Sequence, residues 1–268
     1  VATVGILTLG SGLQGAKSRS DTTMGDIELA EGKKLPSVNQ YTDAAEEGLE
    51  SRIKACLDEL KKQGAQSVVA AEAFSVDDPR NESMVVEACS TRDIPATATN
   101  EISKLYGLKV RTRTAVINAS IMPKMLEAAT MTERSIRQAE IASPLMVMRC
   151  DGGVMTVDEV RKRPILTILS GPAAGVAGAL RYERLTDGLF FEVGGTSTDI
   201  SCVKDGQVMV TYAEVGGHKT YLNSLDVRTV GIGGGSMVQL RDGKAVATGP
   251  RSAHIAGVDY EVYTDPEK

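Results

Sequence analysis

The sequence predicts an α/β protein, and three features of the residue pattern support this prediction. Short apolar runs at residues 2–9 and 67–74 are typical of strands buried on both faces of a sheet. Segments with apolar residues at helical spacing follow these runs, as in a parallel sheet with crossover helices. From residue 189 onward, strand-like runs joined by Asp-Gly pairs replace this alternation. We therefore expect a mostly parallel first lobe over residues 1–180 and a second lobe that opens within residues 181–268.

The first lobe begins with a segment whose composition suggests irregular structure. Residues 10–40 are rich in Gly, Ser, Asp and Lys, which predicts a long surface loop. A helix should begin at Asp43, whose carboxylate can cap the first turn while Glu46 completes a capping box. Gly64 suits the left-handed position that commonly ends a helix.

Two more helices and a strand are expected in the middle of the first lobe. Asp78-Pro79 should open a helix, because an N–H group at the first helical position has no partner within the helix and proline, which lacks this group, is tolerated there. Residues 94–99 predict a strand. Residues 113–141 predict a long helical region that Pro123 should kink or divide.

The last part of the first lobe predicts two strands and two helices. Strands are expected at residues 144–150 and 165–169, and Thr156 with Glu159 forms a second capping box between them. Ser170-Gly171-Pro172 should open the final helix, which is rich in small residues.

The second lobe should open with an antiparallel meander. Asp205-Gly206 and Asp242-Gly243 favour two-residue hairpin turns, because both residue types tolerate positive φ. The strands are expected at residues 189–193, 198–204, 207–212, 236–241 and 244–248, with a tight turn at residues 194–197.

The composition argues against several classes of protein. The 268 residues carry a formal charge of −5 without a basic tail, so no nucleic acid is expected as a partner. No apolar run approaches the roughly 20 residues that span a bilayer, and no signal peptide opens the sequence, so we expect no membrane association. The four cysteines lie far apart, and we interpret them as buried thiols of a cytoplasmic protein.

The segment Gly194-Gly195-Thr196-Ser197-Thr198-Asp199 carries the clearest chemical signal. Two adjacent glycines let the backbone approach an anion closely and direct N–H groups at it. The hydroxyl groups add neutral donors, and Asp199 could hold Mg²⁺ through water. The residues alone leave two interpretations open, a phosphate-binding turn and a plain β-turn with solvated hydroxyl groups.

Three segments, taken in order, resemble the hydantoinase/oxoprolinase family, and in particular its ATP-binding, hydantoinase A-like subunit. They are residues 169–179 (Leu-Ser-Gly-Pro-Ala-Ala-Gly-Val-Ala-Gly-Ala), residues 194–199, and residues 225–236 (Leu-Asp-Val-Arg-Thr-Val-Gly-Ile-Gly-Gly-Gly-Ser). Weaker similarity extends back to about residue 42, so the resemblance covers most of residues 42–253. Residues 1–41 match the family poorly.

This resemblance implies an actin-like fold of the sugar kinase/heat-shock/actin superfamily, with a ribonuclease-H-like sheet in each of two lobes, of which this chain would be an incomplete part. It implies an ATP-dependent hydrolase component that phosphorylates the carbonyl oxygen of a cyclic amide, of the 5-oxoproline or hydantoin type. A second, hydantoinase B-like subunit or domain would complete the hydrolysis. Two alternatives remain, a subunit of an acetone-type carboxylase that acts on a ketone, and a non-catalytic actin-like module that binds a nucleotide or a partner.

The resemblance also implies roles for individual residues. Gly194, Gly195 and Thr196 would hold the β- and γ-phosphates of ATP, in a loop completed by Ser197 and Thr198. The next residue, Asp199, would act on Mg²⁺ or orient the attacking group, which makes Asp199 and Thr196 the catalytic candidates.

Two more segments are candidates for cofactor binding, and each has a second interpretation. Gly233-Gly234-Gly235-Ser236 matches a glycine-rich turn of the family, and it either lies beside the nucleotide or is a loop that needs positive φ. Gly171 lies at the start of an expected helix, whose N–H groups can bind an anion. The alternative there, which we favour slightly, is close packing of small residues between helix and sheet.

The sequence departs from the family at two places. The family's other Gly-Gly-Thr turn has no match in residues 1–41, where Gly10-Ser11-Gly12 is a weak substitute. Residues 253–258 replace a Pro-Gly-Pro-Ala-Cys-like run. Because phosphoryl transfer depends on donors held on both sides of the phosphate, we expect this chain alone to be inactive.

Overall fold

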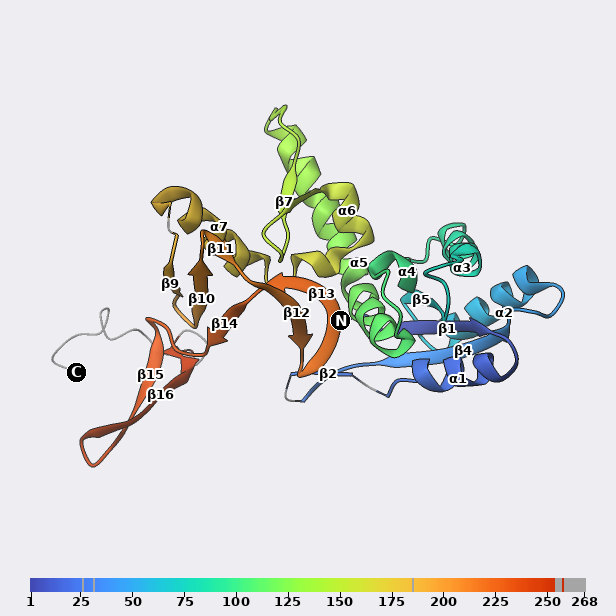
Figure 1. Ribbon diagram of the computed structural model, residues 1–268, viewed down its shortest axis with the longest axis horizontal. Coiled ribbons are helices and arrows are strands. Elements are labelled where there is room, and N and C mark those ends of the chain that lie inside the picture. Colours follow the sequence, from blue (N-terminus) through green and yellow to red (C-terminus); the bar gives the residue numbers. More distant parts are fainter. Residues whose placement is uncertain (26, 31, 185, 254–256, 258–268) are drawn as a thin grey trace. The chain divides into compact units, whose positions relative to one another are not determined.

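The computed structural model describes residues 1–25, 27–30, 32–184, 186–253 and 257, and its helices and strands are labelled in Figure 1. The chain divides into two compact units that alternate along the sequence. Unit 1 comprises residues 1–147, 154–168 and 212–223, and unit 2 comprises residues 148–153, 169–211 and 224 onward. The expected division into lobes at residues 1–180 and 181–268 stays a prediction.

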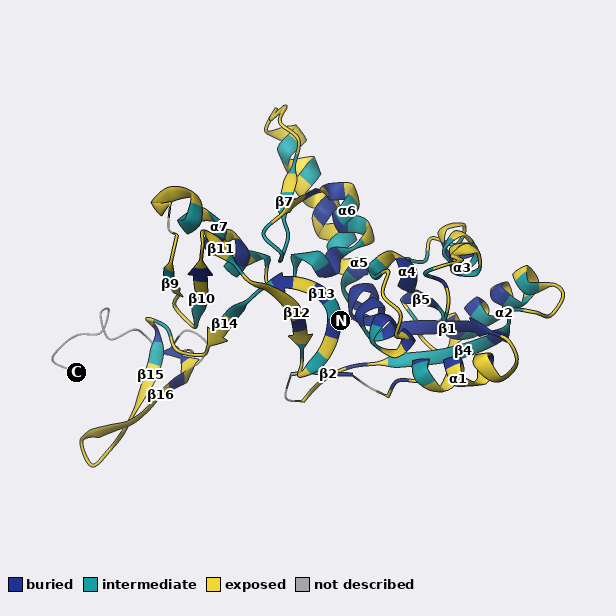
Figure 2. Cartoon of the chain, viewed as in Figure 1, coloured by how far each residue is buried: buried dark blue, intermediate teal, exposed yellow. Residues whose placement is uncertain are grey.

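Unit 1 is built on a four-stranded parallel sheet in the order β4-β1-β5-β6. Strand β1 is buried along its whole length and pairs with β4 on one side and β5 on the other (Figure 2). This arrangement confirms the parallel sheet predicted from the short apolar runs. The strands are β1 (Val4–Gly10), β4 (Ser37–Asp43), β5 (Ser67–Glu72) and β6 (Ala96–Ala98).

The main core of unit 1 lies between this sheet and two helices, α2 (Leu49–Lys62) and α3 (Arg80–Ser90). Helix α2 presents apolar residues at helical spacing, and these pack on alternate residues of β1 and β5. Side chains of this core include Leu7, Leu9, Ile53, Leu57, Leu60, Val68 and Val85. Helices α1 (Gly12–Thr22) and α5 (Leu108–Gln138) also contact the sheet, at β1 and β5 respectively.

Residues 10–40 form regular elements, so the prediction of a long surface loop is wrong. Helix α1 buries only Gly15, Ser18 and Thr22. These side chains are small or polar, and no apolar periodicity therefore marks the helix in the sequence. The segment continues with β2 (Ile27–Ala30), β3 (Lys33–Leu35) and β4.

Three further boundaries differ from expectation. Helix α2 begins at Leu49, because Asp43 is the last residue of β4 and its carboxylate instead accepts a hydrogen bond from the Ala45 N–H group. Helix α5 is continuous through Pro123. The strand expected at residues 165–169 is a 3₁₀ helix, Pro164–Thr167.

Other local predictions for unit 1 are confirmed. Helix α3 begins directly after Pro79. Helix α6 (Val157–Lys162) is capped by the Thr156 hydroxyl, which accepts from the Glu159 N–H group at 3.4 Å. The remaining elements are α4 (Thr99–Ile102) and two strand pairs, β7 (Met146–Met148) with β8 (Val154–Thr156) and β12 (Val210–Val215) with β13 (His218–Leu225).

Unit 2 contains an antiparallel sheet around β10, which confirms the expected pairing of residues 189–193 with residues 198–204. The strand expected at residues 207–212 is wrong as a single element, because it ends at Val208 and a separate strand from Val210 pairs elsewhere. Both central residues of the hairpin turns at Asp205-Gly206 and Asp242-Gly243 have positive φ, as predicted. The strands are β9 (Gly188–Val193), β10 (Thr198–Lys204), β11 (Gln207–Val208) and β14 (Val227–Val230), with a separate hairpin of β15 (Ser236–Arg241) and β16 (Lys244–Ser252).

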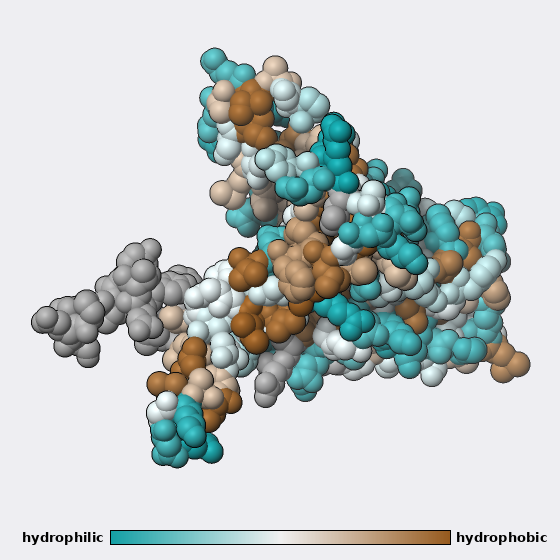
Figure 3. Space-filling model, turned by 60° about the vertical axis from the view of Figure 1, so that its left-hand side comes forward, coloured by the Kyte–Doolittle hydropathy of each residue, from teal (hydrophilic) through white to brown (hydrophobic). Residues whose placement is uncertain are grey.

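Helix α7 (Ser170–Glu183) covers one face of this sheet. The helix packs closely on β9 at Gly175, where a Cβ atom would collide with the Glu192 carboxylate and touch Phe190. Leu189, Phe191 and Val193 alternate with these residues along β9, so they lie on the opposite face. All three are exposed. Figure 3 shows, for one face of the molecule, where hydrophobic residues reach the surface in brown among hydrophilic ones in teal.

The cysteines correct one expectation. Cys89 and Cys150 are buried, but Cys56 is only half-buried and Cys202 is exposed, so the prediction of four buried thiols is wrong. Burial raises the pKa of Cys89 to about 12 and that of Cys150 to about 11. Within the described ranges, no helix is both long and apolar enough to cross a bilayer.

Candidate functional site

Two glycine-rich turns of unit 2 lie against each other. The Gly194–Ser197 turn joins β9 to β10, and the Gly231–Gly235 turn joins β14 to β15. The N–H group of Gly234 donates to the Gly194 carbonyl at 2.8 Å, and that of Gly235 donates to the Gly195 carbonyl at 2.8 Å. The structure therefore joins two of the segments that the sequence proposed as a nucleotide site.

Strand pairing brings these turns together. Thr198, the first residue of β10, lies opposite Val193 of β9 and Val230 of β14. The end of one turn and the start of the other consequently meet at the same edge of the sheet. The Thr198 hydroxyl fastens the two segments by donating to the Ile232 carbonyl at 2.6 Å.

Position 233 needs glycine, because the backbones of the two glycine-rich turns approach each other closely there. A Cβ atom at this position would lie 2.5 Å from the Gly194 oxygen and 2.9 Å from the nitrogens of Thr196 and Ser197. Neither Gly233 nor Gly234 has a positive φ, so the interpretation of this segment as a loop that needs positive φ is wrong. A side chain at position 233 would instead press on the N–H groups of the facing turn.

The Gly194–Ser197 turn presents unused backbone donors. The Gly194 N–H group closes the turn by donating to the Ser197 carbonyl at 2.9 Å. The N–H groups of Gly195, Thr196 and Ser197 have no acceptor among the residues that the structure describes. Successive backbone N–H groups without an acceptor can donate to phosphate oxygens, so the chemistry of this turn fits a nucleotide phosphate.

Asp199 is the acidic residue of this site. It is half-buried in β10, and its Oδ1 atom accepts a hydrogen bond from the hydroxyl of Thr229, its neighbour on β14. This bond fixes the carboxylate and leaves Oδ2 for another ligand. In the described part of the chain, no group of three or more His, Cys, Asp or Glu side chains could hold a metal ion. A magnesium ion here would therefore take most of its ligands from phosphate and water.

The two other candidates differ in their surroundings. Ser236 closes the Gly231–Gly235 turn, because its Oγ atom accepts from the Gly233 N–H group at 2.8 Å. Gly171 lies in the first turn of α7, and among the described residues no hydrogen bond joins it to either glycine-rich turn. A Cβ atom there would meet nothing within 4 Å, so close packing explains Gly175 but not Gly171.

The sequence did not predict the partners that hold this site together. Thr229 and Ile232 contribute a side-chain hydroxyl and a backbone carbonyl. Their position depends on the register between β10 and β14, which no local motif encodes. Of the departing segment at residues 253–258, positions 254–256 and 258 lie outside the described residues.

The fold is α/β of the actin-like ATPase type, as two solved structures show. A nucleotide-free acetone carboxylase aligns with a TM-score of 0.65 and 19% identity, and the alignment covers 92% of this chain and 39% of the carboxylase chain. An ATP-dependent caprolactamase from Pseudomonas jessenii aligns with a TM-score of 0.65 and 21% identity, and the alignment covers 92% of this chain and 39% of the caprolactamase chain. The fold class expected from the sequence is therefore confirmed.

The sequence places the chain in a family within this fold. The model of the Hydantoinase/oxoprolinase family matches residues 111–263, and the chain belongs to that family. The alpha subunit of caprolactamase from Pseudomonas jessenii is 26% identical over 76% of this chain and 30% of its own length. The 5-oxoprolinase of Saccharomyces cerevisiae is 29% identical over 76% of this chain and 16% of its own length. The chain thus spans less than a third of either relative.

Proposed function

We propose that this chain is the ATP-binding component of a hydrolase that acts on a cyclic amide, of the 5-oxoproline or hydantoin type. The observation that carries the proposal is the row of three free N–H groups at Gly195, Thr196 and Ser197, kept open by the glycine at position 233. Membership of the Hydantoinase/oxoprolinase family supports the substrate class, as do relatives named 5-oxoprolinase and caprolactamase.

In this proposal, bound ATP supplies the phosphoryl group that activates the amide carbonyl oxygen for attack by water. The N–H groups of the Gly194–Ser197 turn donate hydrogen bonds to phosphate oxygens. Because these groups are already fixed by the turn, they stabilise the negative charge without a change in the backbone. The free oxygen of Asp199 holds a water ligand of Mg²⁺ or orients the attacking group. The site would lie in the cytoplasm, where ATP is available.

A second subunit or domain, of the hydantoinase B type, would complete the reaction. A relative named as a caprolactamase alpha subunit supports an assembly of more than one kind of chain. The structural likeness to acetone carboxylase favours one alternative, a subunit that activates a ketone oxygen for carboxylation. Both reactions use the same phosphate site on this chain, so binding of ATP is the step to test first.

The test is a calorimetric titration of the protein with ATP and Mg²⁺, comparing the wild type with Gly195→Val. Gly195 is not among the residues with positive φ, so the substitution acts through space rather than backbone strain. A branched side chain beside the free N–H groups should abolish ATP binding and leave the circular dichroism spectrum unchanged. Gly178→Val is a matched control on α7, where a Cβ atom meets nothing within 4 Å. Equal ATP affinity in the wild type and Gly195→Val would remove the turn from the site.

A further inference from the structure

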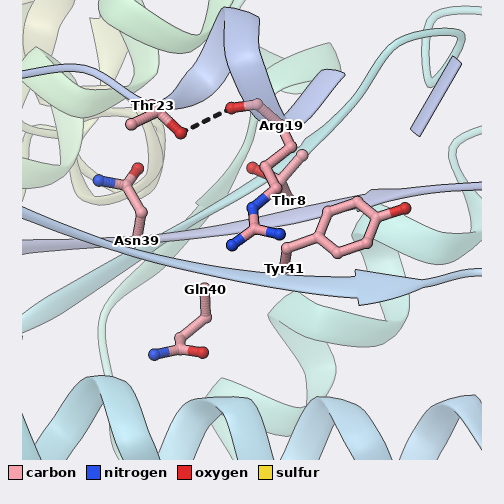
Figure 4. Close-up of a pocket in the computed structure, with 6 residues that line it drawn as sticks. All are labelled: Thr8, Arg19, Thr23, Asn39, Gln40 and Tyr41. Atoms are coloured by element: carbon pink, nitrogen blue, oxygen red, sulfur yellow. Dashed lines mark hydrogen bonds between the residues drawn. The ribbon is translucent and has the colours of Figure 1, made fainter. Parts of the chain in front are cut away.

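A polar pocket lies in unit 1 between α1 and the edge strand β4, with a volume of about 350 Å³. That volume lies in the range of sites for small molecules. Figure 4 shows Asn39 and Tyr41 on the side of β4 that faces Arg19 and Thr23, whereas Gln40 points to the other side. The lining residues are Thr8, Arg19, Thr23, Asn39, Gln40 and Tyr41.

One side of the pocket offers a positively charged donor. The guanidinium carbon of Arg19 lies 5.7 Å from the centre of the Tyr41 ring, and the Tyr41 hydroxyl is itself fixed by donating to the Gly10 carbonyl at 2.8 Å. The Arg19 guanidinium makes no ion pair or hydrogen bond with any other residue that the structure describes. Its donors are therefore free for a carboxylate, which a guanidinium binds with two parallel hydrogen bonds.

The other side of the pocket offers three oxygen acceptors. The Oδ1 atom of Asn39 is buried and has no hydrogen-bond partner among the described residues. The Thr23 hydroxyl donates its proton to the Arg19 carbonyl at 2.7 Å. The Thr22 hydroxyl donates its proton to the Ser18 carbonyl at 2.9 Å. The hydroxyl oxygens of Thr8 and Thr22 lie 2.6 Å apart, and because the Thr22 proton is already used, Thr8 is the donor in this contact. The hydroxyl oxygens of Thr8 and Thr23 thus have only lone pairs left to offer.

We propose that this pocket binds a small amino acid as a zwitterion, with the carboxylate on Arg19 and the ammonium group at Asn39 and Thr23. An ammonium group has three donors and no acceptor, so it can donate to the Asn39 Oδ1 atom and to the Thr23 hydroxyl oxygen. Burial of an unpaired oxygen costs stability, and a ligand that donates to Asn39 would offset that cost.

The ligand class has a chemical link to the proposed function, although the binding does not depend on it. Hydrolysis of any cyclic amide breaks the bond between carbonyl carbon and nitrogen, water supplies the hydroxyl and the proton, and the product carries both an amine and a carboxylate. The pocket would therefore recognise the ring-opened product of such a reaction, at a site whose residues are distinct from the phosphate-binding turn.

The first test compares amino acids with their deaminated analogues by calorimetric titration in the absence of ATP. The probes are L-glutamate, 4-aminobutyrate and 6-aminohexanoate, each paired with glutarate, butyrate or hexanoate. At least one amino acid should bind about tenfold more tightly than its analogue, as expected for a charge-assisted hydrogen bond. If none binds, or if every pair binds equally, the proposal fails. Because no ATP is present, this outcome is independent of the ATP titration above.

Matched variants separate the two sides of the pocket. Arg19→Gln should weaken amino-acid binding about tenfold or more, whereas Lys17→Gln, which removes the same charge from the same helix, should leave it unchanged. Lys17 pairs with Asp21 and does not line the pocket. Equal losses in both variants would indicate a general charge effect and overturn the assignment.

Asn39 is tested by two substitutions. Asn39→Leu should reduce the affinity for the amino acid to that of its deaminated analogue, without changing the affinity for the analogue. Asn39→Asp keeps an acceptor at the same place and should retain amino-acid binding even if Asn39→Leu fails to fold. Loss of binding in a folded Asn39→Asp variant would contradict the role of Asn39 as an acceptor. Thermal unfolding establishes that each variant is folded.

Discussion

Gly233 is the residue whose replacement the structure constrains most closely. In Gly233→Ala the new methyl group would overlap the Gly194 oxygen at 2.5 Å, so the two glycine-rich turns would have to separate. We expect the free energy of unfolding in urea to fall by about 1–3 kcal/mol, as for other overpacked sites. Gly234→Ala is the matched control, because its nearest neighbour would lie 3.8 Å away. Similar stabilities for the two variants would contradict the close contact between these turns.

Because the Cys89 thiol is buried, the stability of the folded protein should fall as the pH becomes alkaline. Burial raises the pKa of this thiol to about 12 in the folded protein, whereas an unfolded cysteine ionises near about 8.5. The folded state therefore holds the proton that the unfolded chain releases, so this contribution is complete below about pH 8.5 and is lost as the pH rises further.

The free energy of unfolding is measured between pH 7 and about pH 10.5, a range that extends to both sides of the pKa of an unfolded cysteine. Cys89→Ala should reduce the decline of stability at alkaline pH, whereas Cys202→Ala, which removes an exposed thiol, should not. A decline that is the same in the wild type and in Cys89→Ala would show that this thiol ionises without unfolding.

Among the elements, the start of α5 is held to the carboxyl end of β5 by a buried arginine. The Arg111 side chain is fully buried and donates to the Glu72 carbonyl at 2.6 Å and to the Thr99 hydroxyl at 2.9 Å. Thr99 in turn contacts the buried Glu82 carboxylate at 2.5 Å. Arg111→Met should therefore lower the free energy of unfolding by about 1–3 kcal/mol, because it removes the buried hydrogen bonds that the guanidinium donates to the Thr99 hydroxyl and to the Leu105 and Glu72 carbonyls.

Arg113→Met serves as its control, measured by urea unfolding in the same way. Arg113 lies two residues further along α5 and makes one long bond, at 3.4 Å, to the Lys219 carbonyl. Its replacement should cost less than about 1 kcal/mol. If both variants lose similar stability, the buried network does not connect α5 to the sheet as described.

The elements that could be predicted from the sequence are those whose signal is local. The apolar runs of β1 and β5, and the Asp-Gly hairpins, each carry their reason within a few residues. Helix α1 could not be predicted, because its buried face is made of Gly15, Ser18 and Thr22. The sequence predicts a strand at residues 165–169 where the structure has a 3₁₀ helix at residues 164–167, because a short apolar run fits either structure.

The same distinction applies to the candidate site. The Gly194–Ser197 turn was visible as a motif, but its contact with Gly233 depends on strand register between distant segments. The sequence does not predict the polar pocket around Arg19 and Asn39, because both residues lie within residues 10–40, whose composition indicates a loop. A weak signal exists in residues 37–41, where Ser37, Asn39 and Tyr41 occupy alternate positions, as on the polar face of a strand.

For the whole molecule, we predict that residues 1–268 alone do not hydrolyse ATP at a measurable rate. The chain offers one clear set of phosphate donors, in unit 2, and the family's other Gly-Gly-Thr turn has no match in residues 1–41. Donors on one side leave the transferring group poorly positioned and accessible to water.

A coupled assay of ADP release tests this, with 5-oxoproline, hydantoin, or acetone with bicarbonate as the second substrate. The rate should equal the background for every substrate. A higher rate that disappears in Asp199→Asn would show that the site is complete within these residues. The substrate that gives such a rate would also distinguish cyclic amide hydrolysis from carboxylation.

The exposed face of β9 has a consequence for the behaviour of the protein in concentrated solution. Leu189, Phe191 and Val193 line one side of a strand that pairs only with β10 in the described part of the sheet. Its other edge keeps backbone donors and acceptors that a strand from another molecule can join, and the apolar side chains favour such contacts. We therefore expect Phe191→Lys to reduce association at high protein concentration, measured by light scattering, without disturbing α7 on the opposite face.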